Sequence, residues 1–264
     1  MRPLSDCPPS VLRSARGLLF DIDDTLTTDG RLTAEAYSAL AQLSQAGLRV
    51  IPITGRPAGW CDHIARMWPV DAVVGENGAF WFCYDHAARR MQRSFVDTAG
   101  VRVQNRARLQ DIGERILAAV PGSAIAADQQ YRECDLAIDF CEDVPRVPAE
   151  AVQTIVQLMT AEGMTAKVSS IHVNGWFGRH DKLTMTKQLF ADVFGESLDS
   201  VRSEYLFAGD SPNDAPMFGY FPYSVGVANV HDFAGQLAHE PAYVTERRAG
   251  DGFAELARQL IQSR

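Results

Sequence analysis

The stretch Leu18-Leu19-Phe20-Asp21-Ile22-Asp23-Asp24-Thr25-Leu26 joins a short apolar run directly to a group of acidic residues. The apolar run predicts the end of a buried strand, and the Thr-rich segment that continues to Gly30 predicts a turn. Asp21 and Asp23 stand two residues apart, so the period of a strand sends both side chains toward one side of the strand end. The stretch therefore predicts a strand that delivers acidic side chains to its carboxyl end.

The residues that follow alternate between strand and helix patterns. Apolar residues recur at helical spacing from Thr33 to Gly47, and a second helical stretch covers residues 60–67. Residues 48–53 and 70–74 are apolar runs of strand length. This alternation predicts an α/β fold with a parallel sheet.

The pattern changes beyond about residue 85. Helical spacing covers residues 109–117 and 152–159, residues 136–141 alternate as a half-buried strand does, and residues 166–173 read as one further strand. Buried strand patterns resume only at residues 205–208 and 224–227. We therefore predict a discontinuous core of residues 1–84 and 178–264, with an inserted α+β domain of residues 85–177.

Composition narrows the class of protein. The 264 residues are 46% hydrophobic and 22% charged, which is typical of a globular chain, and no apolar run approaches the roughly 20 residues of a membrane-spanning helix. The first ten residues lack the basic and then apolar pattern of a secretory signal, so we expect a cytoplasmic protein. Five cysteines without a C-x-x-C pair indicate neither a disulfide framework nor a zinc site. A net charge of -8 and the absence of a basic run argue against a nucleic acid partner, and the lack of a long apolar run argues against a membrane.

A second acidic group, Gly209-Asp210-Ser211-Pro212-Asn213-Asp214, follows the apolar residues 205–208. It places two more carboxylates at the carboxyl end of a strand, and gathering four acids without a cation is electrostatically costly. Mg²⁺ takes oxygen ligands and commonly shares its coordination with a substrate phosphate. A hard divalent cation is therefore expected, although a solvated acidic turn at Asp21 and Asp23, or a helix cap at Asp210 or Asp214, is the alternative for each group alone.

The residue types suit phosphate chemistry. One ionised carboxylate can attack phosphorus and bind a cation while the other protonates the leaving oxygen and later activates water. Thr54 can donate its hydroxyl to a phosphoryl oxygen, with help from the loop amides that follow it, and Lys182 can neutralise phosphate and nucleophile together. Taken singly, Thr54 also suits a helix cap and Lys182 a surface position. Lys187 is the competing lysine, but it lies well inside the helix that Lys182 opens.

These motifs together resemble the haloacid dehalogenase superfamily. The resemblance covers the whole chain and rests on the order Asp21-Ile22-Asp23-Asp24-Thr25-Leu26, Thr54-Gly55-Arg56, Lys182 and Gly209-Asp210-x-x-Asn213-Asp214. The placement of the insert, after Glu76-Asn77-Gly78-Ala79, is similar to the type-II capped subclass B branch, which is rich in sugar phosphatases. Leu183 stands where the family pattern has a glycine after the motif lysine.

The resemblance implies a Rossmann-like core with an α+β cap and assigns roles to these residues. Asp21 would be the nucleophile and a metal ligand, and Asp23 the general acid and base whose backbone carbonyl also meets the metal. Thr54, Gly55, Arg56 and Lys182 would hold the phosphoryl group. Asp210 would bind Mg²⁺ directly, while Asn213 and Asp214 complete or orient its coordination.

Specificity is expected to come from the cap, which closes over the site. Candidates for contact with the substrate are Arg132, which could bind a second anionic group, and the alternating residues Ser170, His172 and Asn174; Asn77 is the candidate in the loop before the cap and is expected at a hinge. An ordinary surface or interdomain role is the alternative for each of the four cap residues.

The expected activity is hydrolysis of a small phosphomonoester, such as a sugar phosphate or a glyceryl glycoside phosphate, through an aspartyl phosphate. A phosphomutase that returns the phosphoryl group to a sugar is the nearest alternative. A sensor of phosphorylated metabolites is an alternative of another class, and a receiver domain, which uses similar residues, is roughly half as long as this chain.

Overall fold

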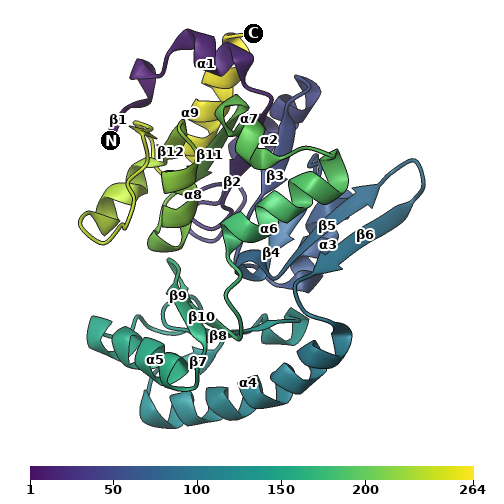
Figure 1. The fold of residues 1–264 in the computed structure, drawn as a ribbon. Helices are drawn as coiled ribbons and strands as arrows, with labels where there is room; N and C mark the ends of the chain where they lie inside the picture. The colour runs from purple at the N-terminus through teal and green to yellow at the C-terminus, as the bar shows by residue number, and fades with distance from the viewer.

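The computed structural model describes residues 1–264. The chain forms two domains, a core with a parallel sheet and a cap that lies below it in Figure 1. All strand pairs of the six-stranded core sheet are parallel, as predicted for the α/β class. In spatial order its strands are β1 (Arg2–Pro3), β13 (Tyr243–Val244), β12 (Ser224–Gly226), β11 (Tyr205–Gly209), β2 (Gly17–Phe20) and β3 (Arg49–Pro52).

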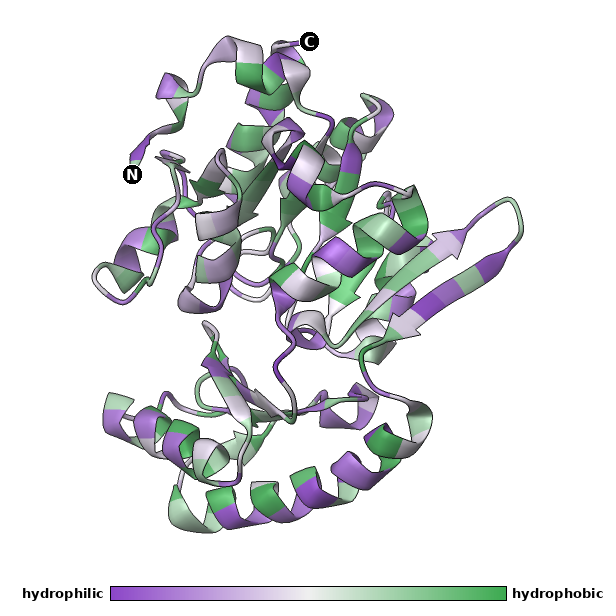
Figure 2. Cartoon of the chain, viewed as in Figure 1, coloured by the Kyte–Doolittle hydropathy of each residue, from purple (hydrophilic) through white to green (hydrophobic).

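Strand β2 lies inside the sheet because its apolar side chains are buried on both faces. Leu18 and Phe20 face one hydrophobic cluster, Leu19 faces the other, and all three are fully buried. The two clusters are covered by helices α1 (Pro9–Ser14), α2 (Ala34–Gln45) and α9 (Ala249–Gln262) on one face and by α6 (Lys182–Leu189), α7 (Leu198–Val201) and α8 (Ala215–Tyr220) on the other. In the hydropathy view the strands of this sheet are mostly hydrophobic, which agrees with burial between two helical layers (Figure 2).

The core continues beyond β3 into an antiparallel extension. Residue Ile53 bridges to Val74 in β4 (Val73–Gly75), and β4 pairs with the hairpin β5 (Phe80–Asp85) and β6 (Arg90–Phe95). Helix α3 (Ala58–Met67) packs against β4 and β5. The division between core and cap at residue 84 stays a prediction, but these pairings favour a first crossing after β6, at residues 96–98.

The cap has its own sheet and its own hydrophobic cluster. Its four antiparallel strands run in the order β7 (Ala124–Ile125), β8 (Asp135–Asp139), β10 (His172–Trp176) and β9 (Thr165–Val168). Helices α4 (Ala99–Ala119) and α5 (Ala149–Ala161) lie on the side of this sheet away from the core (Figure 1).

The expectation of a single strand at residues 166–173 was wrong, because a turn divides it into β9 and β10. The Ser169 hydroxyl accepts the N–H groups of Ile171 and His172, at 3.4 and 3.0 Å. Such a side-chain bond offers the backbone an alternative to the ladder of the sheet. His172 and Asn174 therefore lie on β10, whereas Ser170 lies in the turn.

None of the helices combines the length and the apolar character that crossing a lipid bilayer requires.

Candidate active site

Two acidic groups meet at the carboxyl edge of the core sheet, where adjacent strands β2 and β11 end. The register pairs Phe20 with Ala208, and the Asp21 N–H donates to the Ala208 carbonyl at 2.9 Å. Carboxylate oxygens of Asp21, Asp210 and Asp214 lie within 4.8 Å of one another, and all three residues are buried. The parallel register thus brings together carboxylates that are about 190 residues apart in the sequence.

Asp214 is held in place by the backbone that leads to it. Its Oδ2 atom accepts the N–H groups of Asp210 and Ser211, at 3.1 and 3.4 Å. Gly209 makes this close approach possible, because a Cβ at that position would lie 2.5 Å from the same oxygen. The tight turn after β11 therefore requires glycine and fixes one wall of the acidic cluster.

Lys182 inserts its ammonium group between two of the carboxylates. It is the first residue of α6, whose start is fixed by a capping box between Asp181 and Thr184. Its Nζ atom donates to Asp21 Oδ1 at 2.9 Å and to Asp214 Oδ1 at 2.7 Å. Burial works against the charge of Lys182, but the two carboxylates raise its pKa above the ordinary value. Lys187, the competing lysine, instead pairs with Asp199 at the surface.

The cluster has fewer positive than negative charges, because Lys182 is the one basic side chain that pairs with it, through Asp21 and Asp214. Burial, with Asp214 and Asp23 adding to it, raises the pKa of Asp21 to about 8, although Lys182 acts in the opposite direction. Burial and the neighbouring Asp214 also raise the pKa of Asp210 well above its ordinary range. A hard cation with oxygen ligands fits this donor set, since it would compensate the charge that the protein leaves uncompensated.

Two further residues fix the orientation of Asp210, and the motifs did not single them out. The Thr25 hydroxyl donates to Asp210 Oδ1 at 3.0 Å. Asn229 Nδ2 lies 3.3 Å from Asp210 Oδ2 and donates to the Asp24 carbonyl at 2.9 Å. Thr25 belongs to the quoted acidic stretch, whereas Asn229 follows a short strand and nothing in the sequence marks it.

The loop after β3 lies beside this cluster. Thr54 is fully buried, and its hydroxyl oxygen accepts the Arg56 N–H at 3.0 Å. A Cβ on Gly55 would lie 3.1 Å from the Asn77 side-chain amide, so the loop packs closely on the segment before the cap. The Arg56 guanidinium is committed to the carboxylates of Asp23, Asp128 and Glu142, so its position does not support a phosphate contact by that side chain. The loop starts beside the end of β2, because the Ile53 N–H donates to the Phe20 carbonyl at 2.7 Å.

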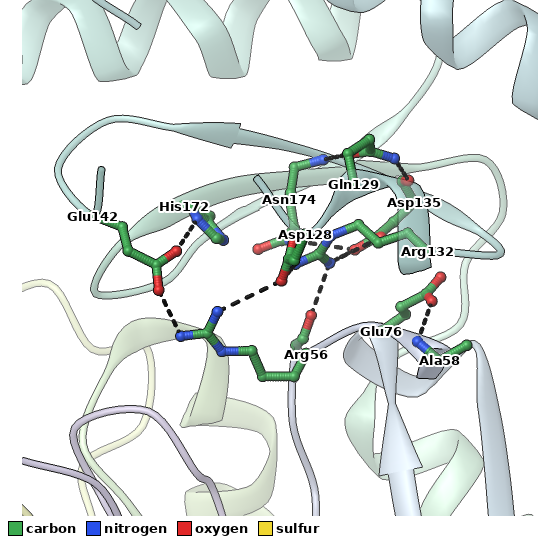
Figure 3. Close-up of polar contacts among 12 residues, drawn as sticks. Arg56, Ala58, Glu76, Asp128, Gln129, Arg132, Asp135, Glu142, His172 and Asn174 are labelled. Carbon is green, nitrogen blue, oxygen red and sulfur yellow. Dashed lines mark hydrogen bonds and ion pairs between the residues drawn. The ribbon is translucent and has the colours of Figure 1, made fainter. Parts of the chain in front are cut away.

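The segment before β5 is strained and buried. Glu76 and Asn77 have φ values of 43° and 54°, in the left-handed region that few non-glycine residues adopt. Asn213 Nδ2 donates to Asn77 Oδ1 at 3.4 Å, so the candidate Asn77 touches the second acidic motif. Glu76 accepts the N–H group of Ala58 in the core at 2.9 Å (Figure 3). It also accepts the N–H group of Cys134 in the cap at 2.6 Å, and it therefore joins the two domains.

The cap residues that were expected to meet substrate have other partners. Arg132 donates to both Asp128 and Asp135 at distances of 2.9 to 3.1 Å, and to the Gly55 carbonyl at 2.9 Å. Its guanidinium is buried and committed to the protein, so its position does not support binding of a second anionic group. Asn174 donates to Asp135 at 2.9 Å and belongs to the same network (Figure 3).

The remaining two cap candidates lie closer to the core site. His172 Nε2 lies 2.8 Å from a Glu142 oxygen, and Glu142 in turn contacts Arg56 of the core. Ser170 and Asp24 both line a cleft between core and cap with a volume of about 1050 Å³. This cleft reaches Asp210, so it connects the acidic cluster with the cap surface.

The sequence profile of the haloacid dehalogenase-like hydrolases matches residues 18–101, which include most of β2, the acidic stretch and Thr54. This segment is that of a haloacid dehalogenase-like hydrolase. The recognition drawn from the motifs is therefore confirmed.

Two curated relatives span nearly the whole chain, and both are named as phosphatases, in agreement with the expected enzyme class. A phosphoglycolate phosphatase of Haloarcula marismortui is 27% identical over 95% of this chain and 96% of its own length. A phosphoglycolate phosphatase of Methanothermobacter thermautotrophicus is 26% identical over 93% of this chain and 99% of its own length.

A solved structure with a similar fold also covers nearly the whole chain. The C-terminal domain of the C. albicans trehalose-6-phosphate phosphatase superposes with a TM-score of 0.70 at 15% identity, covering 99% of this chain and 98% of that one. Trehalose-phosphate phosphatases belong to the branch that the placement of the cap predicted. This likeness confirms the predicted fold, a parallel-sheet core with an inserted cap domain, over the full length of the chain.

Proposed function

We propose that this chain is a Mg²⁺-dependent phosphomonoester hydrolase in which Asp21 forms an aspartyl phosphate. The observation that carries the proposal is the position of Lys182 between Asp21 and Asp214, with Asp210 in the same cluster. This arrangement presents a carboxylate, a fixed ammonium group and further oxygen ligands at one point. The match to haloacid dehalogenase-like hydrolases and the two phosphatase relatives support the same chemistry.

Asp21, Asp210 and the turn that holds Asp214 would bind the metal. When bound, Mg²⁺ supplies positive charge that offsets the carboxylates and the phosphoryl oxygens. Lys182 neutralises Asp21 and the incoming phosphate, and it is already oriented because both its partners are fixed. Thr54 and the amides after it would hold the phosphoryl oxygens beside the nucleophile.

The reaction would run in two steps. A carboxylate oxygen of Asp21 bonds to phosphorus while the bond from phosphorus to the ester oxygen breaks, and Asp23 gives its proton to the departing alkoxide. Asp23 then takes a proton from water, whose oxygen attacks the phosphorus of the aspartyl phosphate. Inorganic phosphate leaves, and Asp21 returns to its carboxylate form with Asp23 protonated again.

The substrate would be a small phosphorylated metabolite that enters through the cleft between core and cap. Asp21, Thr54 and Lys182 are at most 4% exposed, so only the edge of the cluster at Asp210 opens into the cleft. A phosphorylated sugar or glyceryl glycoside suits the type-II cap fold, and 2-phosphoglycolate is the substrate class in the names of the two relatives. Both classes are small enough for this space.

Phosphate release from 2-phosphoglycolate, a panel of sugar phosphates and p-nitrophenyl phosphate tests the proposal, with Mg²⁺ or with EDTA. We expect release that requires Mg²⁺ and that falls at least about 10³-fold in Asp21→Asn, because the substituted amide is a poor nucleophile. Asp199→Asn is the matched control, since it removes the carboxylate of the surface pair with Lys187. Transfer between sugar positions without release of phosphate would identify a mutase instead.

A further inference from the structure

A chain of charged side chains connects the expected acid and base to the cap. Arg56 Nε donates to both oxygens of Asp23, at 2.9 and 3.0 Å, and a terminal nitrogen of Arg56 lies 2.8 Å from Glu142 Oε1. The other Glu142 oxygen lies 2.8 Å from His172 Nε2. Glu142 thus stands between His172 of its own domain and Arg56 of the core (Figure 3).

Arg56 is the only residue that bonds to the Asp23 carboxylate. The Asp23 side chain is 17% exposed and follows the end of β2 in a loop, so its own backbone does not fix its rotamer. The bidentate contact therefore sets the direction in which Asp23 points. A contact that fixes the position of the Arg56 guanidinium therefore also fixes the orientation of the Asp23 carboxylate.

Glu142 is presented to Arg56 by a preformed loop. The buried Asp139 at the end of β8 accepts the N–H groups of Cys141, Glu142 and Asp143, at 2.7 to 2.8 Å. His172 is the partner of Asp139 in the register of β8 and β10 and is itself buried. The loop and the histidine thus fix the Glu142 carboxylate before Arg56 reaches it.

The contact is charged on both sides. The neighbouring imidazole of His172, whose Nε2 lies 2.8 Å from Glu142 Oε2, and the Arg56 guanidinium lower the pKa of Glu142 to about 2. Burial opposes the charge of Arg56, but Asp23 and Glu142 raise its pKa above the ordinary value. The Trp60 ring lies 4.4 Å from the guanidinium carbon, and Asp128 of the cap lies 3.5 Å from its remaining nitrogen. Glu142 is therefore the closest contact that the cap makes with this guanidinium.

We propose that Glu142 is a positioning residue, which acts through Arg56 to orient Asp23 for proton transfer to the leaving group when the cap is docked. The inference rests on the proposed function and adds a cap residue to it. Because Glu142 belongs to the cap and Asp23 to the core, the link exists only while the two domains are in contact. Docking of the cap would then align the acid in the same movement that covers the substrate.

The dependence on the leaving group separates positioning of the acid from a general loss of structure. An alkoxide needs a proton as it departs, whereas p-nitrophenolate departs readily without one. For Glu142→Gln we expect kcat/KM to fall about tenfold with the alkyl phosphate that wild type hydrolyses best, a part of the 10²–10⁴ that a positioned acid contributes. With p-nitrophenyl phosphate we expect a change within about twofold.

The matched control is Glu162→Gln, which removes a cap carboxylate that pairs with Arg115 at the surface. It should leave both rates unchanged. In an Arg56→Ala background, Glu142→Gln should have no additional effect, because the connection to Asp23 is already cut. An equal loss with both substrates, or no loss with either, overturns the positioning role while the phosphatase proposal stands on wild-type turnover.

A crystal structure of the Glu142→Gln protein tests the geometry independently of turnover. We expect Arg56 to lose its bidentate contact with Asp23, because the closest of the cap carboxylates that hold the guanidinium has lost its charge. An unchanged contact between Arg56 and Asp23 would overturn the inference even if the chain hydrolysed no phosphate ester.

Discussion

Lys182 is the residue on which the charge of the site depends, because it is the one cation that contacts Asp21 and Asp214. Lys182→Met keeps the length of the side chain and removes the charge, leaving two buried carboxylates without their partner. We expect kcat/KM for phosphate release to fall at least about 10²-fold. Steady-state kinetics of the variant beside wild type measures this.

Lys187→Met is the control at the same scale, because Lys187 pairs with Asp199 on the surface of the same helix. It should retain wild-type kinetics. If Lys182→Met kept more than about a tenth of the activity, the ammonium group would be a structural counter-ion and not part of the phosphate site.

The 3-10 turn Glu76–Gly78 packs against the start of α6 and positions it on the core. Gly78 has a φ of 104°, and a Cβ there would lie 2.0 Å from the Asp181 carbonyl oxygen. Gly78→Ala should therefore displace the first turn of α6, which carries Lys182, and reduce phosphate release. Urea unfolding should show a lower free energy of unfolding for this variant. The backbone conformation costs an alanine roughly 1–2 kcal/mol, and the overlap of its Cβ with the Asp181 carbonyl should add about 1–3 kcal/mol.

Gly47→Ala separates the two costs, because Gly47 has a φ of 76° and no atom near the position of its Cβ. It should show only the backbone cost and full activity. Equal losses of stability for Gly47→Ala and Gly78→Ala would mean that the turn Glu76–Gly78 shifts at little cost and does not fix the position of Lys182.

The stability of the whole molecule should depend jointly on pH and on Mg²⁺. Burial raises the pKa of Asp21 to about 8, above the ordinary carboxyl value of 3.8. The folded state then binds more protons than the unfolded state between these values, so the contribution of Asp21 is complete below 3.8 and is lost as the pH rises through about 8. Bound Mg²⁺ would take the place of the proton on Asp21. Its stabilising effect should therefore grow as the pH rises.

Thermal unfolding with Mg²⁺ or EDTA at mildly acidic pH and at about pH 8 measures this. We expect the larger increase in Tm from Mg²⁺ at the higher pH, and its loss in Asp210→Asn. An increase that is the same at both pH values, or that persists in the variant, would contradict binding of the cation at the acidic cluster.

The predictions made from the sequence succeed or fail according to whether the structure depends on the hydrophobic pattern or on specific contacts. The parallel core was predicted correctly because its strands are buried on both faces and read as continuous apolar runs. The strand at residues 166–173 was misjudged, because the Ser169 hydroxyl turns the chain through a bond that hydrophobic pattern does not encode. The predicted boundary at residue 84 separates β6 from most of β5, whereas the pairings of β5 with β4 and with β6 favour keeping this hairpin in the core.

The sequence by itself determined that acidic residues stand at the ends of buried strands and that Lys182 opens a helix, and a parallel sheet then requires the strand ends to meet. Only the tertiary structure decided the partners of Arg56, Arg132 and Glu142. Long charged side chains can reach several partners, and the fold chooses among them by the distance and burial that it creates. Arg56 and Glu142 are 86 residues apart, so only the docking of the cap on the core joins them to Asp23.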